Sequence, residues 1–192
     1  TGYMPQYVDL DFEISIYENL IIYSELYGVS PQKAKSRIQN FSEIFNFNHI
    51  LFEKPTNQSI GVLRSIQFSR ALLHDPKVLL LDEPTSGMDP EYKVKLWNIL
   101  DRIGSEKTIL YTTQDFNEAE KFADRISILH NGDIKMDGSL GRLVGATKGL
   151  SKYEIRFRNN PEDNILVQLN EMRNILKPTL NGNSLEFYSN DK

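Results

Sequence analysis

The sequence predicts an α/β fold built on a parallel sheet, followed by a small α+β module. Two short apolar runs, residues 77–81 and 108–112, are typical of strands buried on both faces of such a sheet. The segment 91–103 between them has the apolar spacing of a helix, so strand, helix and strand form a right-handed crossover. With 40% hydrophobic and 25% charged residues, the 192-residue chain can bury one sizeable core.

The part of the chain before the first buried strand is predicted to be largely helical. Residues 3–7 form a loop by their Pro and polar content. Ser15 and Glu18 form a capping-box pattern, and the Ser30-Pro31 pair is a second helix start. The spacing of apolar residues then predicts three helices, over residues 15–27, 30–45 and 63–73.

The second half of the chain begins with a helix through Ala119 and Phe122. Residues 125–130 and 133–136 flank Asn131-Gly132, the strongest short hairpin signal. Residues 145–149 are predicted to be a linker, so the first domain covers 1–146 and a small module covers 147–192. The module is predicted as a strand, a helix and a strand, over residues 153–158, 161–176 and 184–188, with a turn at 181–183.

Composition excludes several classes of function. There is no cysteine, so disulfides and thiolate metal sites are excluded. No uncharged apolar run approaches the roughly 18 residues needed to cross a bilayer. With 22 basic and 26 acidic residues, the surface as a whole does not attract nucleic acid, and a phosphate ligand would need a local site.

Two adjacent carboxylates, Asp82 and Glu83, follow the first buried strand, and Pro84 ends that strand. They therefore lie at the carboxyl edge of a parallel sheet, where such folds place ligands. Hydrolysis of a nucleoside triphosphate needs one carboxylate that holds Mg²⁺, usually through water, and a second that orients or deprotonates the attacking water. Asp82 suits the first role and Glu83 the second, whereas the alternative is a solvated acidic turn.

The segment LLLDEPTSGMDP, residues 79–90, resembles the Walker B and D-loop segment of ABC ATPases at nearly every position. This resemblance implies a P-loop NTPase-like parallel sheet with a helical subdomain at about 13–75 and a core at about 76–140. It also places Asp89, in the D-loop, among the nucleotide-binding residues. The segment DRISILHNGDIKMDG, residues 124–138, resembles the hairpin that closes the core of this family.

Other landmarks of the family follow in the expected order. Gln6, in GYMPQ, resembles the Q-loop glutamine, which contacts Mg²⁺ and the attacking water and links the core to the helical subdomain. Gln114, in TTQDFNEAE, lies at the switch position, where most ABC ATPases carry histidine. Glutamine donates a hydrogen bond but takes up no proton near neutral pH, so its role is positional and Glu83 remains the base.

Residues 58–62, QSIGV, occupy the position of the LSGGQ signature. In the family, this helix start and its serine hydroxyl reach the γ-phosphate of ATP held by the opposite subunit. Ser59 and Gly61 keep the signature residues, whereas Ile60 replaces a glycine that lets the backbone approach phosphate closely. We expect Ile60 to obstruct or displace the loop and to reduce hydrolysis; the alternative is that this segment is only a helix start.

The family's phosphate-binding loop, GxxxxGK followed by Ser or Thr, does not occur in the sequence. In ABC domains this loop precedes the Q-loop. Because the chain opens abruptly at Thr1 without an initiator Met, we expect it to be truncated before the Q-loop and to bind ATP poorly alone.

The resemblance implies an ATP-binding and ATP-hydrolysing subunit of an ABC-type exporter, similar to the ATPases of the daunorubicin-resistance type. Its cofactors would be ATP and Mg²⁺, and its partners transmembrane permease subunits and a second ABC subunit, in a homo- or heterodimer. It would lie in the cytoplasm, on the inner face of the cell membrane. One alternative is a nucleotide-binding regulatory protein with weak or no hydrolysis; another is an ABC factor acting on ribosomes or DNA, which the net acidity disfavours.

Overall fold

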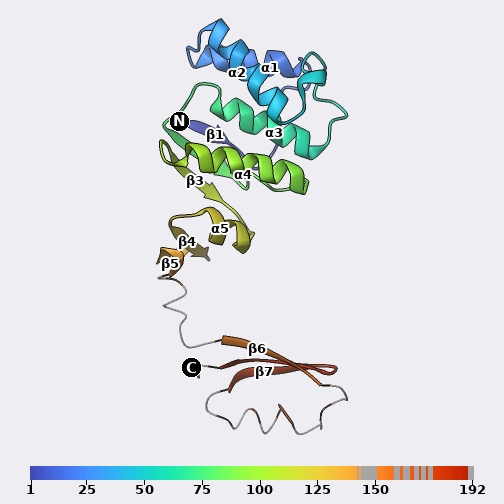
Figure 1. Cartoon of the computed structure of the whole chain (residues 1–192), viewed down its shortest axis with the longest axis vertical. Coiled ribbons are helices and arrows are strands. Elements are labelled where there is room, and N and C mark those ends of the chain that lie inside the picture. The colour runs from blue at the N-terminus through green and yellow to red at the C-terminus, as the bar shows by residue number, and fades with distance from the viewer. Residues whose placement is uncertain are drawn as a thin grey trace. The chain divides into compact units, whose positions relative to one another are not determined.

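The computed structural model describes residues 1–141, 143, 151–157, 161, 165–166, 169, 172 and 175–189. The chain forms two compact units, Thr1–Phe122 and Ala123–Lys192, and Figure 1 labels most of their helices and strands. The elements of the first unit are, in chain order, β1 (Gly2–Met4), α1 (Ile16–Leu26), α2 (Pro31–Ile44), the 3₁₀ helix η1 (Asn48–Ile50), α3 (Ile60–Leu72), β2 (Val78–Asp82), α4 (Pro90–Gly104), β3 (Thr108–Thr112) and α5 (Phe116–Phe122). In the described part of the chain, no helix combines the length and apolar character that a membrane crossing needs.

The helices predicted from apolar spacing are confirmed, and their starts follow local capping chemistry. The Ser15 hydroxyl accepts a hydrogen bond from the Glu18 amide, and the Glu18 carboxylate accepts one from the Ser15 amide, which completes the capping box of α1. Helix α3 begins before the predicted residue 63, because the Ser59 hydroxyl accepts from the Val62 amide at 3.3 Å.

The first unit contains a parallel sheet with the strand order β1-β2-β3. The predicted strands β2 and β3 are confirmed, whereas the prediction of a loop over residues 3–7 is wrong for the residues of β1. Three residues are too short to display the alternation by which a strand is recognised. A Cβ on Gly2 would lie 2.3 Å from the carbonyl oxygen of Ala71, so β1 can pack against the end of α3 only with glycine there.

The prediction that the sheet is buried on both faces is wrong. Leu79 and Leu81 are at most 2% exposed and belong to the main apolar cluster. The opposite face carries Tyr3 and Leu110, which are 50% and 64% exposed, on either side of the half-buried Leu80 in the same register. We call these three residues the open face, because the apolar cluster of the described residues covers only the other side of the sheet.

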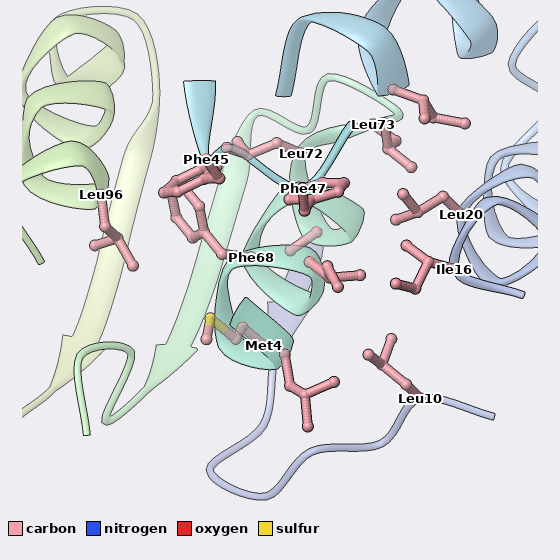
Figure 2. Close-up of a cluster of buried hydrophobic side chains, with 14 of the residues drawn as sticks. Met4, Leu10, Ile16, Leu20, Phe45, Phe47, Phe68, Leu72, Leu73 and Leu96 are labelled. Atoms are coloured by element: carbon pink, nitrogen blue, oxygen red, sulfur yellow. The ribbon is translucent and has the colours of Figure 1, made fainter. Parts of the chain in front are cut away.

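The core of the first unit forms where α1, α3 and the aromatic residues after α2 meet. Phe45, Phe47 and Phe68 are 0% exposed, and each such side chain contributes about 1.5–3 kcal/mol of burial free energy. Figure 2 shows Ile16 and Leu20 on α1 pointing toward the same cluster. This cluster fixes α3 beside the sheet.

A second group of rings joins α4, β3 and α5. Trp97 stacks on Phe122 with ring centroids 4.4 Å apart and meets Tyr111 edge-on at 5.0 Å. Such aromatic pairs contribute about 0.5–1.5 kcal/mol beyond the burial of their area. They hold both ends of the segment that contains Gln114.

The second unit contains five strands in its described residues, in two antiparallel sheets. One sheet pairs β4 (Ile126–His130) with β5 (Asp133–Gly138). The other has the strand order β6-β8-β7 and consists of β6 (Ser151–Arg156), β8 (Ser184–Ser189) and β7 (Ile175–Asn181). The β4–β5 hairpin is confirmed, with positive φ at Asn131 and Gly132 as a type I′ turn requires.

The small module differs from the prediction at β7, which occupies the end of the predicted helix 161–176. Pro178 lies at a register shift between β7 and β8, and a proline inside a run normally argues against a strand. Most of the predicted helix, the predicted linker 145–149 and the boundary at 146 lie outside the described residues.

Candidate functional site

The carboxyl ends of β2 and β3 bring the predicted acidic pair together with a threonine. Asp82 and Thr112 are register partners and end their strands. The Thr112 hydroxyl donates to Asp82 Oδ1 at 2.5 Å and accepts from the Glu83 amide at 2.9 Å. Thr112 therefore fixes both acids, although the sequence analysis assigned it no role; its signal was its position at the end of the second strand.

Glu83 and Gln114, the two predicted catalytic residues, are in direct contact. Gln114 Nε2 donates to Glu83 Oε1 at 2.6 Å. Glu83 has φ 43°, in the left-handed region that non-glycine residues rarely adopt. Backbone conformations of this kind occur where the surrounding structure holds them, and they are frequent at functional sites.

Gln6 follows β1, and its loop is joined to the acidic pair by Arg64 of α3. One guanidinium nitrogen of Arg64 donates to the carbonyl oxygens of Pro5 and Gln6, both at 2.7 Å. The other donates to the carbonyl oxygens of Asp82 at 3.2 Å and Glu83 at 2.5 Å. The Gln6 side chain itself is exposed, so the structure places the Gln6 backbone, and not its side chain, in this network.

Arg64 is 1% exposed, and burial lowers the pKa of its guanidinium while the charges of Asp82, Glu83 and Asp9 raise it. An arginine stays protonated even so, and it therefore places a fixed positive charge beside the two carboxylates. The sequence analysis missed Arg64, whose signal was a single charged residue on an otherwise well-buried turn of helix.

The predicted signature and D-loop residues form a second group at the start of α3. A Cβ on Gly61 would lie 3.7 Å from the Asp89 amide nitrogen, and a Cβ on Gly87 would lie 3.3 Å from the Ile60 side chain. Gly61 and Asp89 are thus brought together. Ile60 is 49% exposed and rests against Gly87 at a regularly capped helix start, so its effect on a bound phosphate stays a prediction.

Helix α3 contacts both groups of predicted site residues. Asp82, Glu83, Gln114 and the Gln6 backbone form the first group, and the residues around Ser59 form the second. No hydrogen bond found within the described residues joins the groups directly, and α3 spans from one to the other.

The donor atoms of the first group suit a hard cation. In the described part of the chain, no cluster of three or more His, Cys, Asp or Glu residues could hold a metal by itself. Mg²⁺ is usually held by one or two carboxylates together with water and substrate phosphates. The carboxylates of Asp82 and Glu83 offer oxygen ligands of that kind at one strand end, so the residues fit Mg²⁺ bound together with phosphate.

A buried carboxylate that was not predicted from the sequence connects the two segments that follow β2 and β3. Glu118 is 6% exposed and accepts from the Thr85 hydroxyl at 2.7 and 2.8 Å and from the Thr113 hydroxyl at 3.0 Å. It thus ties the residues after Glu83 to the residues before Gln114.

The parallel sheet with paired acids at its carboxyl edge, and a helical segment between its first two strands, is the fold of an ATP-binding cassette. A solved structure described as the ATP-binding subunit of an ABC transporter is similar, with a TM-score of 0.71 and 26% sequence identity over 76% of this chain and 61% of that chain. A dimeric ATP-binding cassette in a post-hydrolysis state with ADP and Pi has the same fold, with a TM-score of 0.64 and 24% identity over 72% of this chain and 62% of that chain.

The family model described as ABC transporter matches residues 1–86. A Nod factor export ATP-binding protein I of Rhizobium sp. (strain N33) is 33% identical over 163 residues, which are 84% of this chain and 53% of that protein. The chain is thus similar to ABC transporter ATP-binding proteins over most of its length. It spans about half the length of the curated exporter relatives it matches.

Proposed function

We propose that this chain carries the magnesium- and water-handling part of the ATPase site of an ABC exporter. The observation that carries the proposal is the contact of Gln114 Nε2 with Glu83 Oε1 beside Asp82, at the carboxyl edge of the sheet. One carboxylate that can hold a cation and a second that is oriented by an amide are what phosphoryl transfer to water requires.

Each predicted site residue has a role in this proposal. Asp82 and Gln6 would hold Mg²⁺, which neutralises charge on the phosphates when it is bound. Glu83 accepts the proton of the attacking water, and Gln114 orients the Glu83 carboxylate. The second group, Ser59, Gly61 and Asp89, faces the nucleotide of a second ABC subunit, as the capped start of α3 permits.

The proposal includes parts that lie outside these 192 residues. The 192 residues hold no GxxxxGK motif, so the loop that grips the phosphates must be supplied from outside them. We propose that the working unit is a dimer of ABC domains on the inner face of the membrane, coupled to transmembrane permease subunits. Support comes from the exporter relatives and from the dimeric cassette described above.

Replacement of Glu83 by Gln tests the proposal in the ATPase assembled with its phosphate-binding loop. We expect ATP turnover to fall by about 10²–10⁴-fold, because the general base is lost, while ATP remains bound and dimers accumulate. Turnover and dimer mass are measured by phosphate release and light scattering. Glu120→Gln, an exposed carboxylate of α5, is the matched control. Unchanged turnover in Glu83→Gln would remove Glu83 as the base.

A second candidate is a nucleotide-binding regulatory protein with weak or no hydrolysis. It is favoured by Ile60, a branched and half-exposed side chain at a helix start where close approach to phosphate needs glycine. Ile60→Gly distinguishes the two candidates: a regulator should gain turnover by at least about tenfold, whereas an efficient ATPase should change little.

A further inference from the structure

Helix α3 carries a polar stripe on a face that is otherwise buried. Arg64, Gln67 and Arg70 are spaced three residues apart, which places them along one side of the helix. Their side chains are 1%, 0% and 8% exposed. Buried polar groups of this kind persist only when they have hydrogen-bond partners, so their partners reveal what the stripe holds.

Two members of the stripe, Gln67 and Arg70, donate hydrogen bonds to the loop that follows β1, and Arg70 also lies over the Tyr23 ring of α1. Gln67 Nε2 donates to the carbonyl oxygen of Tyr7 at 2.8 Å and to Asp9 Oδ1 at 2.9 Å. Arg70 donates to the Asp9 carbonyl at 3.2 Å and forms an ion pair with the Asp9 carboxylate. These contacts hold the loop at Tyr7 and Asp9, and none of them reaches the acidic pair.

Arg64 differs because it joins two segments of the candidate site. Its guanidinium donates to the carbonyl oxygens of Pro5 and Gln6 on one side and to those of Asp82 and Glu83 on the other. The shorter of the latter bonds, at 2.5 Å, goes to the carbonyl of Glu83, the residue with the left-handed φ of 43°. Only a planar group with several fixed N–H donors can bind four carbonyl oxygens in this way.

We propose that Arg64 is a positioning residue for ATP hydrolysis, which sets the separation between Gln6 and the Asp82–Glu83 pair. This inference rests on the proposed function. Arg64 does not touch the reacting atoms; it holds the backbone on both sides of the cation site and keeps Glu83 in the conformation in which its carboxylate meets Gln114. A lysine would keep the charge but would present a single nitrogen, which cannot bind both segments in the same geometry.

The test compares Arg64→Lys with Arg70→Lys in the assembled ATPase. The control makes the same change on the same helix, at a residue that contacts Asp9 of the loop and the Tyr23 ring but not the acidic pair. We expect Arg64→Lys to lower kcat by about 10²-fold with little change in the KM for ATP, because misplacement by about 1 Å can cost this much. We also expect the Mg²⁺ concentration for half-maximal activity to rise by about tenfold, whereas in Arg70→Lys both quantities stay within about threefold of the wild type.

The magnesium dependence separates positioning from a loss of folded protein. A smaller folded fraction lowers the apparent kcat but leaves the half-activating Mg²⁺ concentration unchanged. Equal effects of the two substitutions, or a lower kcat with unchanged magnesium dependence, would overturn the inference.

A second measurement needs no activity and uses the 192-residue chain. Amide hydrogen exchange should accelerate in both residues 5–9 and 82–86 of Arg64→Lys, and only in residues 5–9 of Arg70→Lys. Arg64→Gln, which keeps an amide donor but removes the charge, serves if the lysine variant does not fold. Exchange that changes only in residues 5–9 of the Arg64 variants contradicts the inference.

The two proposals fail in different ways. A wild-type assembly without ATP hydrolysis rejects the proposed function. Hydrolysis that is lost in Glu83→Gln but kept in Arg64→Lys rejects only the role of Arg64.

Discussion

Glu83 illustrates how the candidate site is held at the scale of single residues. Its left-handed backbone costs about 1–3 kcal/mol, which the surrounding contacts must offset. The Thr112 hydroxyl binds its amide, Arg64 binds its carbonyl oxygen and Gln114 binds its carboxylate. The backbone and the side chain of Glu83 are thus fixed separately, by three different residues.

Glu118→Gln tests the buried support beneath this residue. The variant replaces one acceptor oxygen by a donor and cannot accept from both threonine hydroxyls as the carboxylate does. We expect a loss of about 1–3 kcal/mol in the free energy of unfolding, the cost of leaving a buried polar group without its partner. Urea unfolding followed by circular dichroism measures it. Glu120→Gln on the same helix, which is exposed, should change stability by less than about 0.5 kcal/mol.

Single residues also show what the sequence can and cannot predict about the site. Asp82 and Glu83 were predicted because they lie at the end of a recognisable strand, and Gln114 was predicted because its segment resembles the switch region of the family. Arg64 was missed because its partner Pro5 is 59 residues away, and no local pattern encodes a contact of that length. Its assignment needed the fold.

At the scale of elements, helices and hairpins that depend on contacts between residues close in sequence were predicted well, and elements that depend on distant residues were not. The capping box of Ser15 and Glu18 acts within one helical turn, and α1 was predicted within one residue. The β4–β5 hairpin was found for the same reason, from Asn131-Gly132. Strand β1 is only three residues long and depends on pairing with β2, so nothing in its own sequence identifies it.

Asp75, in the segment between α3 and β2, forms ion pairs with α2 and with the segment between α4 and β3, and these pairs predict how stability depends on pH. Its carboxylate binds Lys107 at 2.5 Å and lies 3.6 Å from Arg37 of α2, and the hydrogen bond from Lys107 is the main cause of its lowered pKa. A lowered carboxyl pKa stabilises the fold at pH values above the unfolded pKa of about 3.9, and this stabilisation is lost as the pH falls through the folded value.

Asp75→Asn should therefore destabilise the chain at neutral pH and not in acid. Asparagine tolerates the positive φ of this position, so the change is confined to the charge. Because the side chain is 59% exposed, we expect a loss of only about 0.5–1 kcal/mol at pH 7. Thermal unfolding of both proteins at neutral pH and near pH 2.5, below the carboxyl pKa of about 3.9, measures it. A difference that persists unchanged in acid would contradict the ion-pair explanation.

At the scale of the whole molecule, one face of the sheet in the first unit exposes apolar side chains. The described residues leave Tyr3 and Leu110 of the open face at least 50% exposed, and β3 has no second neighbour among the described strands. An exposed strand edge with an apolar residue on it is a site of association with other strands. The sequence could predict the strands but not this asymmetry, because an apolar run reads the same whether one or both of its faces are covered.

Leu110→Lys should reduce self-association of the 192-residue chain. The side chain is 64% exposed, so the change removes little packing, while a lysine on an edge strand opposes pairing. We expect a lower weight-average mass at about 100 μM protein in sedimentation experiments, a concentration in the range where exposed edges cause aggregation. Val94→Lys, 59% exposed on α4 and away from any strand, is the control and should leave the mass unchanged. An equal decrease in mass for both variants would mean that the added surface charge, and not the strand edge, controls self-association.

The ring stack of Trp97 gives the molecule an optical reporter. Trp97 is the only tryptophan in the sequence, and its buried indole nitrogen has no hydrogen-bond partner among the described residues. Its emission should therefore lie at short wavelength, as for an indole in an apolar solvent, and should arise from the first unit alone. Tyr111 and Phe122 flank Gln114 along the chain and contact Trp97. A displacement of that segment would therefore change the emission wavelength and intensity of the intrinsic tryptophan fluorescence.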